Sequence, residues 1–561
     1  MSQEIRIGAV AAAAAVVLSG GVAPAQATPL QGARHVLLIS IDGMHALDFR
    51  NCVAQRTCPT LAALGARGVT YTRTSTSMPS DSFPGLMALV SGGTPRTVGA
   101  YYDVAYDRVL APPQHTTGNG VAGGRCVAGA PNGTTTEYEE GIDLDPSKLN
   151  GGGPYGVTDG GIQSIDPTRL PRDPANGCAP VYPWNFVRTN TIYGVIHAAK
   201  GYTAWSDKHP AYASVSGPGD AASNVDDYYS PEINSTVIPL PGVKTATGMA
   251  CSPVADPTQL GAWTDSFKNV QCYDTLKSDA IVNQIKGLWH DGSRSAPVPA
   301  VFGMNFQAVS VGQKLIEGGS QKGGYLDAAG TPSAPLADAI AFVDASIGRM
   351  VFTLQQQGLA DSTTVIVTAK HGQSPIDPAR FFPIPGNTGA NGTSPANLIA
   401  DLLPTSESPT NPDGIGPTED DLSLLWLKRG ADTAVAVQTL EANAKAAGIG
   451  EIFHGPALAT MFGKPGLPPH GDPRVPDIIV QPNTGVIYTG SSKKQAEHGG
   501  FAHDDTNVML LVSNPALKAR SVNTAVETTQ VAPSILKMLG LDPNALDAVR
   551  LEGTRPLPDL F

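Results

Sequence analysis

Four short segments carry polar side chains that could do chemistry together. Asp42 and His371 each follow an apolar, β-branched run, Ser82 precedes an apolar helical segment, and His498 lies in a segment rich in Gly and Asp. In an open parallel sheet, ligands bind beyond the carboxyl ends of the strands. A hydroxyl, a carboxylate and two imidazoles gathered there could bind and attack an anionic ester.

Ser82 stands just before the predicted helix over residues 86–90. The free N–H groups of a first helical turn favour an anion such as a phosphoryl group. Two simpler interpretations stay open at this point. Ser82 is also a suitable plain N-cap, and a single His371 is more often a satisfied polar residue than a ligand.

The elements that must position these residues alternate between strands and helices. Strands are predicted over residues 35–41, 68–72, 363–368, 477–480 and 508–512, and helices over 335–358 and 528–539. This alternation predicts an α/β fold with a mostly parallel sheet. Residues 112–185 differ, because they are rich in Gly, Pro, Asn and Asp and have little periodicity. We expect them to form part of a long irregular insertion.

Residues 1–27 have the pattern of a secretory signal peptide. Arg6 supplies a positive charge, residues 7–18 are apolar, and the small-residue segment AQA ends at Ala27. A membrane span needs about 20 apolar residues, and this run is shorter. We therefore expect cleavage near Ala27 and a secreted or extracytoplasmic protein without a membrane span.

The chain contains six cysteines. An even number in an exported protein favours disulfides, and six cysteines allow fifteen pairings. Proximity along the chain favours the pairs Cys52–Cys58, Cys126–Cys178 and Cys251–Cys272. A zinc cluster is not expected, since no C-x-x-C spacing occurs.

Taken together, the segments resemble the alkaline phosphatase superfamily, and within it the type I phosphodiesterase/nucleotide pyrophosphatase branch. The resemblance rests on LLISIDGM with Asp42, SMPSDSFPGLMALVSGG with Ser82, DSTTVIVTAKHG with His371 and AEHGGFAHDDTNVMLLVS with His498. It implies an α/β three-layer sandwich with a mostly parallel central sheet and a large loop-rich insertion, or cap. One hydrolase domain then spans residues 28–561, with residues 112–300 as the cap.

The resemblance also implies a reaction, which is phosphoryl transfer at two metal ions. A Ser or Thr hydroxyl attacks phosphorus while the ions clamp the attacking and leaving oxygens. By resemblance Ser82 is the nucleophile, Asp42 and His371 bind one metal, and His498 binds the other. A divalent metal, zinc by resemblance, is the expected cofactor.

Three stretches depart from the family pattern. Lys370 replaces the Asp of the usual Asp-His-Gly, and residues 304–313 lack the expected Asp and His. Asp103 replaces an Asn that assists the phosphoryl oxygens. A lysine in the site repels a second divalent ion, so we do not expect a full two-zinc centre. We expect Asp42 to be the partner of Lys370, because a buried lysine needs one.

Three interpretations fit these departures. The favoured one is an exported hydrolase of phosphoric mono- or diesters with at most one metal, in which Ser82, Lys370 and Asp103 are catalytic and Lys370 faces the phosphoryl or sulfuryl oxygens. A sulfatase-like ester hydrolase is a variant of it. The second is a catalytically silent binding protein on the same fold. The third is a hydrolase whose metal ligands are rebuilt from His45, His503, Asp504 or Asp505.

The expected partner is a small phosphate ester or a related anion. A net charge of −12 argues against a protein that coats nucleic acid. It also gives no long-range attraction for an anion, so local cations matter more. Lys208 and His209 are candidates for gripping the substrate, with loop salt bridges as the alternative. Oligomeric state leaves no mark in the sequence.

Overall fold

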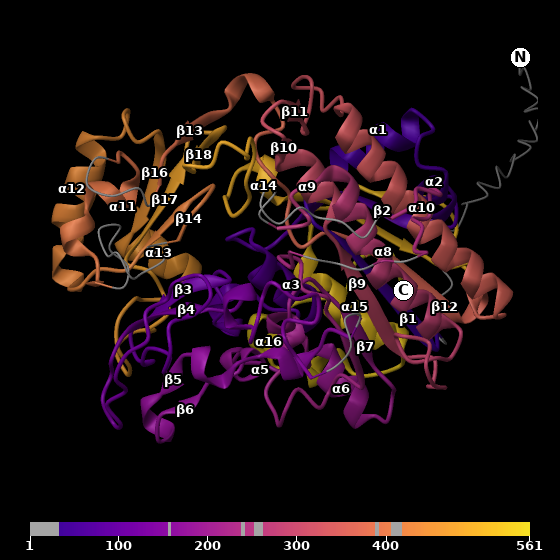
Figure 1. The fold of residues 1–561 in the computed structure, drawn as a ribbon, viewed down its shortest axis with the longest axis horizontal. Coiled ribbons are helices and arrows are strands. Elements are labelled where there is room, and N and C mark those ends of the chain that lie inside the picture. The colour runs from indigo at the N-terminus through magenta and orange to yellow at the C-terminus, as the bar shows by residue number, and fades with distance from the viewer. Residues whose placement is uncertain are drawn as a thin grey trace, which may run out of the picture.

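A computed structural model describes residues 33–154, 159–236, 240, 242–251, 262–386, 392–405 and 418–561 of the chain. Its largest sheet has the strand order β20-β2-β19-β12-β1-β9-β7-β8, and β21 also pairs with β2 (Figure 1). The strands are β1 (His35–Ile41), β2 (Gly68–Ser75), β7 (Ala204–Ser206), β8 (Asp227–Tyr229), β9 (Val301–Phe306), β12 (Thr363–Thr368), β19 (Asn507–Ser513), β20 (Arg520–Val522) and β21 (Val526–Glu527). Five neighbouring strands, from β12 to β8, are parallel.

The two central strands explain why the sheet forms where it does. All six residues of β12, and all but the first residue of β1, are buried. A continuous apolar run suits a strand that is covered on both faces. The predicted α/β fold with a mostly parallel sheet is confirmed, and β19 is the strand that runs antiparallel to both of its neighbours.

Helices cover both faces of the sheet, which completes the three layers. One face packs against α1 (Ala46–Ala54), α2 (Pro59–Gly65), α8 (Phe267–Ile285) and α10 (Ala334–Gln356). The other face packs against α3 (Ser82–Ser91), α6 (Ile192–Ala198) and α15 (Val531–Met538). Figure 1 shows these two groups of helices on opposite sides of the sheet.

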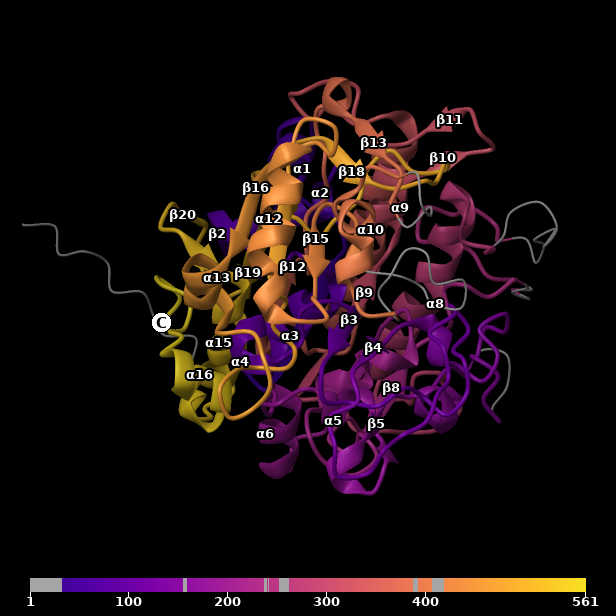
Figure 2. The ribbon, with the colours of Figure 1, turned by 90° about the vertical axis from the view of Figure 1, so that its left-hand side faces the viewer.

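A second, smaller sheet lies beside the first (Figures 1 and 2). Its strands follow the order β14 (Thr418–Glu419), β15 (Ser423–Leu425), β17 (Ile478–Pro482) and β16 (Ile449–His454), and all three pairings are antiparallel. The helices α11 (Pro395–Leu398) and α12 (Thr433–Ala442) pack on it around a separate core. The strand predicted over residues 477–480 exists, but it belongs to this sheet and not to the parallel one.

The interval 112–300, predicted as one insertion, divides into two parts. Its first part forms short hairpins and irregular segments, such as β5 (Arg172–Asp173) with β6 (Ala179–Pro180). From β7 onward it contributes two parallel strands to the central sheet. The cap prediction is therefore too wide, because a three-residue strand such as β7 is too short to give a periodic signal.

The three disulfides join Cys52 to Cys58, Cys126 to Cys178 and Cys251 to Cys272, which confirms the predicted pairing. The predicted signal peptide, residues 1–27, lies outside the described residues. Within the described ranges, none of the helices combines the length and the apolar character that crossing a bilayer requires.

Gly85 offers a test of how tightly α3 is packed against the end of β12. A Cβ atom on Gly85 would lie 2.2 Å from the carbonyl oxygen of Lys370, whereas a Cβ on Gly65 would meet nothing closer than 3.9 Å. Overpacking a well-filled core costs about 1–3 kcal/mol. We expect Gly85→Ala to lower the free energy of unfolding by that amount in urea titrations. Gly65→Ala is the matched control, and an equal effect of the two substitutions would contradict the packing argument.

Candidate active site

The carboxyl edge of the parallel strands gathers the polar residues. Asp42 follows β1, Lys370 and His371 follow β12, and Asp207 and Lys208 follow β7. The register pairs Ser40 of β1 with residues 368 and 305 of its two neighbours, so these ends lie level. Parallel strands that end together bring their following residues to one edge of the sheet.

Ser82 is the first residue of α3, and the helix is capped by Asp81, which accepts a hydrogen bond from the Phe83 N–H. Three groups converge on the buried Ser82 Oγ. It lies 3.1 Å from Nε2 of His371, 3.2 Å from Nζ of Lys208 and 3.4 Å from Oδ2 of Asp42. The nucleophile candidate therefore contacts a ring nitrogen, an ammonium and a carboxylate.

Lys370 has a different partner from the predicted one. Its Nζ lies 2.9 and 3.0 Å from the two carboxylate oxygens of Asp207, and neither side chain is exposed. Asp207 also accepts hydrogen bonds from the indole N–H of Trp205 and the backbone N–H of Lys208. The prediction that Lys370 pairs with Asp42 is wrong, because the strand end that carries Asp207 reaches the same edge.

Asp42 is held by side-chain amides. Asn305 and Gln307 donate to its Oδ2 at 3.0 and 2.6 Å. A second buried ion pair fixes these donors, since Asp274 accepts the backbone N–H of Gln307 and Lys277 donates to the carbonyl of Asn305. Lys277 and Asp274 contact each other at 3.0 Å without exposure to solvent. The amides thus stand next to Asp42 as fixed donors.

Charges in the site follow from these contacts. Burial alone would raise the pKa of Asp42, but Lys370, His371 and Lys208 together hold that pKa well below its usual value. Burial opposes the charge on Lys208 as well, yet Asp42, Asp103 and other carboxylates outweigh it and raise the pKa of this lysine. Asp42 is therefore an anion, and Lys208 is a cation, at neutral pH.

Burial also lowers the pKa of Lys370, and Asp207 opposes this shift. The two ammonium groups share one aromatic ring, because Nζ of Lys370 lies 4.1 Å and Nζ of Lys208 lies 5.6 Å from the ring centroid of Tyr212. Such contacts between a cation and a ring face are attractive. Tyr212 thus helps to keep both ammonium groups in the site.

His498 packs beside His371, with ring centroids 4.0 Å apart. Burial, followed by the charges of His371 and two lysines, holds the pKa of His498 well below its usual value. Its Nδ1 lies 3.6 Å from the carboxylate of Asp81. Asp103 is joined to the same carboxylate, because its backbone N–H donates to Asp81 Oδ2 at 3.1 Å.

A cavity of about 560 Å³ adjoins these residues. Asp103, Lys208, His209, Gln307 and His498 are among the residues that line it. His209 is held by two carboxylates, with Nε2 at 3.1 Å from Glu140 and Nδ1 at 3.0 Å from Glu232. Of the two predicted substrate-binding residues, Lys208 contacts Ser82. His209 is instead bound by Glu140 and Glu232 in the lining of the cavity.

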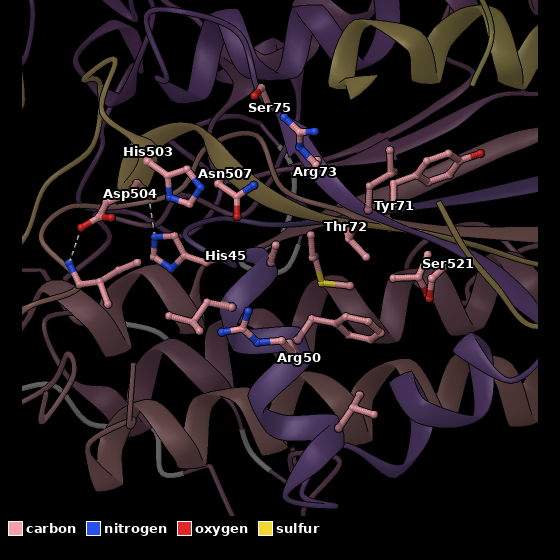
Figure 3. A pocket seen from close by; sticks show the side chains of 18 of the residues that line it. His45, Arg50, Tyr71, Thr72, Arg73, Ser75, His503, Asp504, Asn507 and Ser521 are labelled. Carbon is pink, nitrogen blue, oxygen red and sulfur yellow. Dashed lines mark hydrogen bonds between the residues drawn. The ribbon is translucent and has the colours of Figure 1, made fainter. Parts of the chain in front are cut away.

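A larger cavity, of about 1300 Å³, lies elsewhere (Figure 3). His45, His503 and Asp504 line it together with arginines, as Figure 3 shows, and Ser82 is not among its lining residues. The ring of His45 is bound to Asp48 and to the backbone carbonyls of Gln373 and Asp504. The structure therefore does not join these side chains to Asp42 and His371 as a rebuilt ligand set.

The residues present do not fit a two-metal centre. Within the described ranges, no three or more His, Cys, Asp or Glu side chains are grouped so that they could hold an ion. The ammonium of Lys208 donates a hydrogen bond to Ser82 Oγ, and two side-chain amides donate to Oδ2 of Asp42. Two unit charges 4 Å apart repel by about 4 kcal/mol at an effective dielectric of 20, and a divalent ion beside Lys208 would double that.

Several residues of the site were missed or misjudged from sequence. Asn305 and Gln307 lie within residues 304–313, where the sequence was searched only for the Asp and His of a metal site. Asp274 and Lys277 lie inside a long helix, where a pair three residues apart normally indicates a solvated face. The sequence did offer one signal, since Asp207 and Lys208 adjoin the aromatic Trp205 in a dense polar group.

Comparison with known proteins identifies the family and the fold. A family model described as type I phosphodiesterase/nucleotide pyrophosphatase matches residues 36–136 and 317–505, which make up more than half of the chain. The search of curated proteins gives no match. Among solved structures, murine ectonucleotide pyrophosphatase/phosphodiesterase 5 is similar, with a TM-score of 0.50, 14% identity, and coverage of 92% of this chain and 99% of that chain.

An inactive variant of the same murine protein in complex with AMP is also similar. Its TM-score is 0.50 at 14% identity, and the match covers 91% of this chain and 96% of that chain. At this level of identity the likeness concerns the fold.

The buried pair Lys370–Asp207 generates a stability prediction. Asp207→Asn leaves an ammonium buried without its counter-charge, and breaking such a pair costs about 3–5 kcal/mol. We expect urea titrations to show a loss of this size. Asp547→Asn is the control, because Asp547 and Arg550 form an exposed pair at 2.7 Å, and exposed pairs are worth at most about 1 kcal/mol. Equal losses in the two variants would contradict the assignment.

Proposed function

Because the chain belongs to the type I phosphodiesterase/nucleotide pyrophosphatase family, we propose that it is an exported hydrolase of phosphoric mono- or diesters with Ser82 as its nucleophile. One observation carries the proposal. The buried Ser82 Oγ, at the first turn of α3, contacts His371, Lys208 and Asp42 at once. A hydroxyl with an imidazole, an ammonium and a carboxylate around it has the surroundings of an activated nucleophile.

The positive charge for the phosphoryl oxygens comes from the protein in this proposal. Lys208 is the cation nearest the nucleophile, and an ammonium binds phosphate oxygens as a point charge. Lys370, predicted to face these oxygens itself, supports Lys208 instead through Asp207. Asp103 lines the cavity beside Lys208, where it meets the substrate rather than an ion.

The metal centre is altered relative to the family. Asp42, His371 and His498 are the residues that match family ligands. Two amides donate to Oδ2 of Asp42 and an ammonium donates to Ser82 Oγ, whereas Oδ1 of Asp42 and Nδ1 of His498 have no hydrogen-bond partner among the described residues. The departure from the family rests on the ammonium of Lys208, which donates hydrogen bonds and cannot ligate a cation.

The substrate is a small ester. A volume of about 560 Å³ lies within the range of small-molecule sites. AMP, which is bound in the murine neighbour, is a suitable product analogue to test as an inhibitor. The three disulfides support an extracytoplasmic location, because disulfides persist in oxidising compartments.

Hydrolysis of p-nitrophenyl phosphate, bis-p-nitrophenyl phosphate and p-nitrophenyl sulfate tests the proposal. We expect the wild-type protein to hydrolyse at least one phosphate ester, and Ser82→Ala to lose activity by about 10³-fold or more, because the attacking oxygen is gone. Ser91→Ala is the control, since Ser91 is buried at the other end of the same helix. Equal inactivity of wild type and Ser82→Ala on every ester, with and without added metals, would leave a binding protein as the better account.

A further inference from the structure

The tautomer of His371 is set by its neighbours. Nδ1 lies 2.7 Å from the carbonyl oxygen of Gly372, which can only accept a hydrogen bond. The proton of the neutral ring therefore belongs on Nδ1, and Nε2 carries a lone pair. That lone pair lies 3.1 Å from Ser82 Oγ, so the hydroxyl donates to His371. A nucleophile, a base and a group that orients the base are thus in contact.

The alternative acceptor for the hydroxyl proton is weaker. Oδ2 of Asp42 lies 3.4 Å from Ser82 Oγ and already accepts hydrogen bonds from two side-chain amides. Lys208 is no acceptor, because its ammonium only donates. Ser82 Oγ therefore donates to His371 and accepts from Lys208, which leaves the oxygen facing a cation as its own proton leaves.

His371 is itself held in place. Its side chain is buried, and the ring packs against His498 at a centroid distance of 4.0 Å. Nε2 also lies 3.7 Å from the carboxylate of Asp42. These contacts fix the orientation of the imidazole ring, so that its Nε2 faces the hydroxyl.

We propose that Ser82 and His371 form a nucleophile–base dyad that works without a divalent ion, and that Lys208 supplies the positive charge at the attacking oxygen. This inference rests on the proposed function, because it assumes that Ser82 attacks phosphorus.

In the first step the Ser82 Oγ–P bond forms, the P–O bond to the leaving group breaks, and the Ser82 proton passes to His371 Nε2. The leaving oxygen takes a proton from water. In the second step the oxygen of a water molecule bonds to phosphorus, the Ser82 Oγ–P bond breaks, the water releases a proton to solvent, and Ser82 Oγ recovers its proton from His371.

The geometry separates this arrangement from activation by a metal. An ion on Ser82 Oγ would lie beside the ammonium of Lys208, which repels it, and an ion on His371 would take the Nε2 lone pair that receives the proton. Lys370 is a positioning residue in this scheme. It fixes Asp207, whose Oδ1 accepts the backbone N–H of Lys208 and so sets where that side chain begins.

Covalent labelling tests the dyad independently of ester turnover. The protein is dialysed against EDTA and dipicolinate, its zinc content is measured, and an alkyl fluorophosphonate is added. Attack by Ser82 forms a P–O bond and breaks the P–F bond, the proton goes to His371, and fluoride leaves. We expect mass spectrometry to locate the label on Ser82, at the same rate with and without chelator.

Two variants identify the base and the cation. His371→Ala should slow labelling by about 10²–10⁴-fold, which is the usual contribution of a general base, and imidazole should restore part of the rate in the presence of chelator. Lys208→Met should slow labelling by at least about tenfold, the effect of losing one charge-assisted hydrogen bond. The exposed residues His470 and Lys148 provide the controls His470→Ala and Lys148→Met, which should label like wild type.

The outcomes separate the dyad from the proposed function. Loss of labelling and of turnover on chelation, with recovery on added zinc, would overturn the dyad and leave the phosphoester hydrolase standing. Metal-independent labelling of Ser82 in a protein that cleaves none of the esters would support the dyad and overturn the proposed function. Failure of wild type to label, or labelling of His371→Ala at the wild-type rate, would also overturn the dyad. The chelation experiment needs no variant, so misfolding of His371→Ala leaves it decisive.

Discussion

The buried ion pair between Lys370 and Asp207 is the interaction on which the arrangement of the site depends. It joins the ends of two strands that are separated in the sheet by β1 and β9, so it ties together the edge on which all the polar residues stand. Removing two charges from water is costly, and such a pair persists only where its remaining donors and acceptors are satisfied. Here Asp207 receives two further N–H groups, from Trp205 and Lys208, and the ring of Tyr212 faces the ammonium. The same carboxylate that neutralises Lys370 therefore sets the position of Lys208 next to Ser82.

The way in which Asp42 is held follows the same logic. A buried carboxylate needs nearby donors or cations to offset its lost hydration. Asn305 and Gln307 both donate to Oδ2 of Asp42, whereas its Oδ1 is buried without a hydrogen-bond partner in the described part of the chain. The buried Lys277–Asp274 pair fixes the backbone from which the amides project. Amide donors and buried ammonium groups thus stand together at this edge of the sheet.

Sequence alone predicted the parts of this molecule that depend on local pattern. The apolar runs of β1 and β12, the helix predicted over residues 86–90, and the disulfide pairs of neighbouring cysteines all leave a continuous signal in the chain. In the structure that helix begins earlier, at Ser82, and Asp81 is its N-cap. The partner of Lys370 left none, because strand order in a parallel sheet is set by tertiary packing and β7 has only three residues. The same reason explains the strand at residues 478–482, whose composition suits either sheet but which pairs antiparallel with β15 and β16. Amide donors such as Gln307 could not be recognised either, since a search for ligands looks for Asp and His.

The surroundings of His498 can be understood without a metal ion. Its ring is uncharged at neutral pH, because burial and the neighbouring cations hold its pKa well below the usual value. A neutral ring can pack with its centroid 4.0 Å from that of His371 without charge repulsion. An uncharged His498 also keeps the nearby carboxylate of Asp81 available to the first turn of α3, where Asp81 accepts the Phe83 N–H and caps the helix that carries Ser82. The residue that matches a family ligand therefore packs against the base and lies beside the carboxylate that caps the helix of the nucleophile.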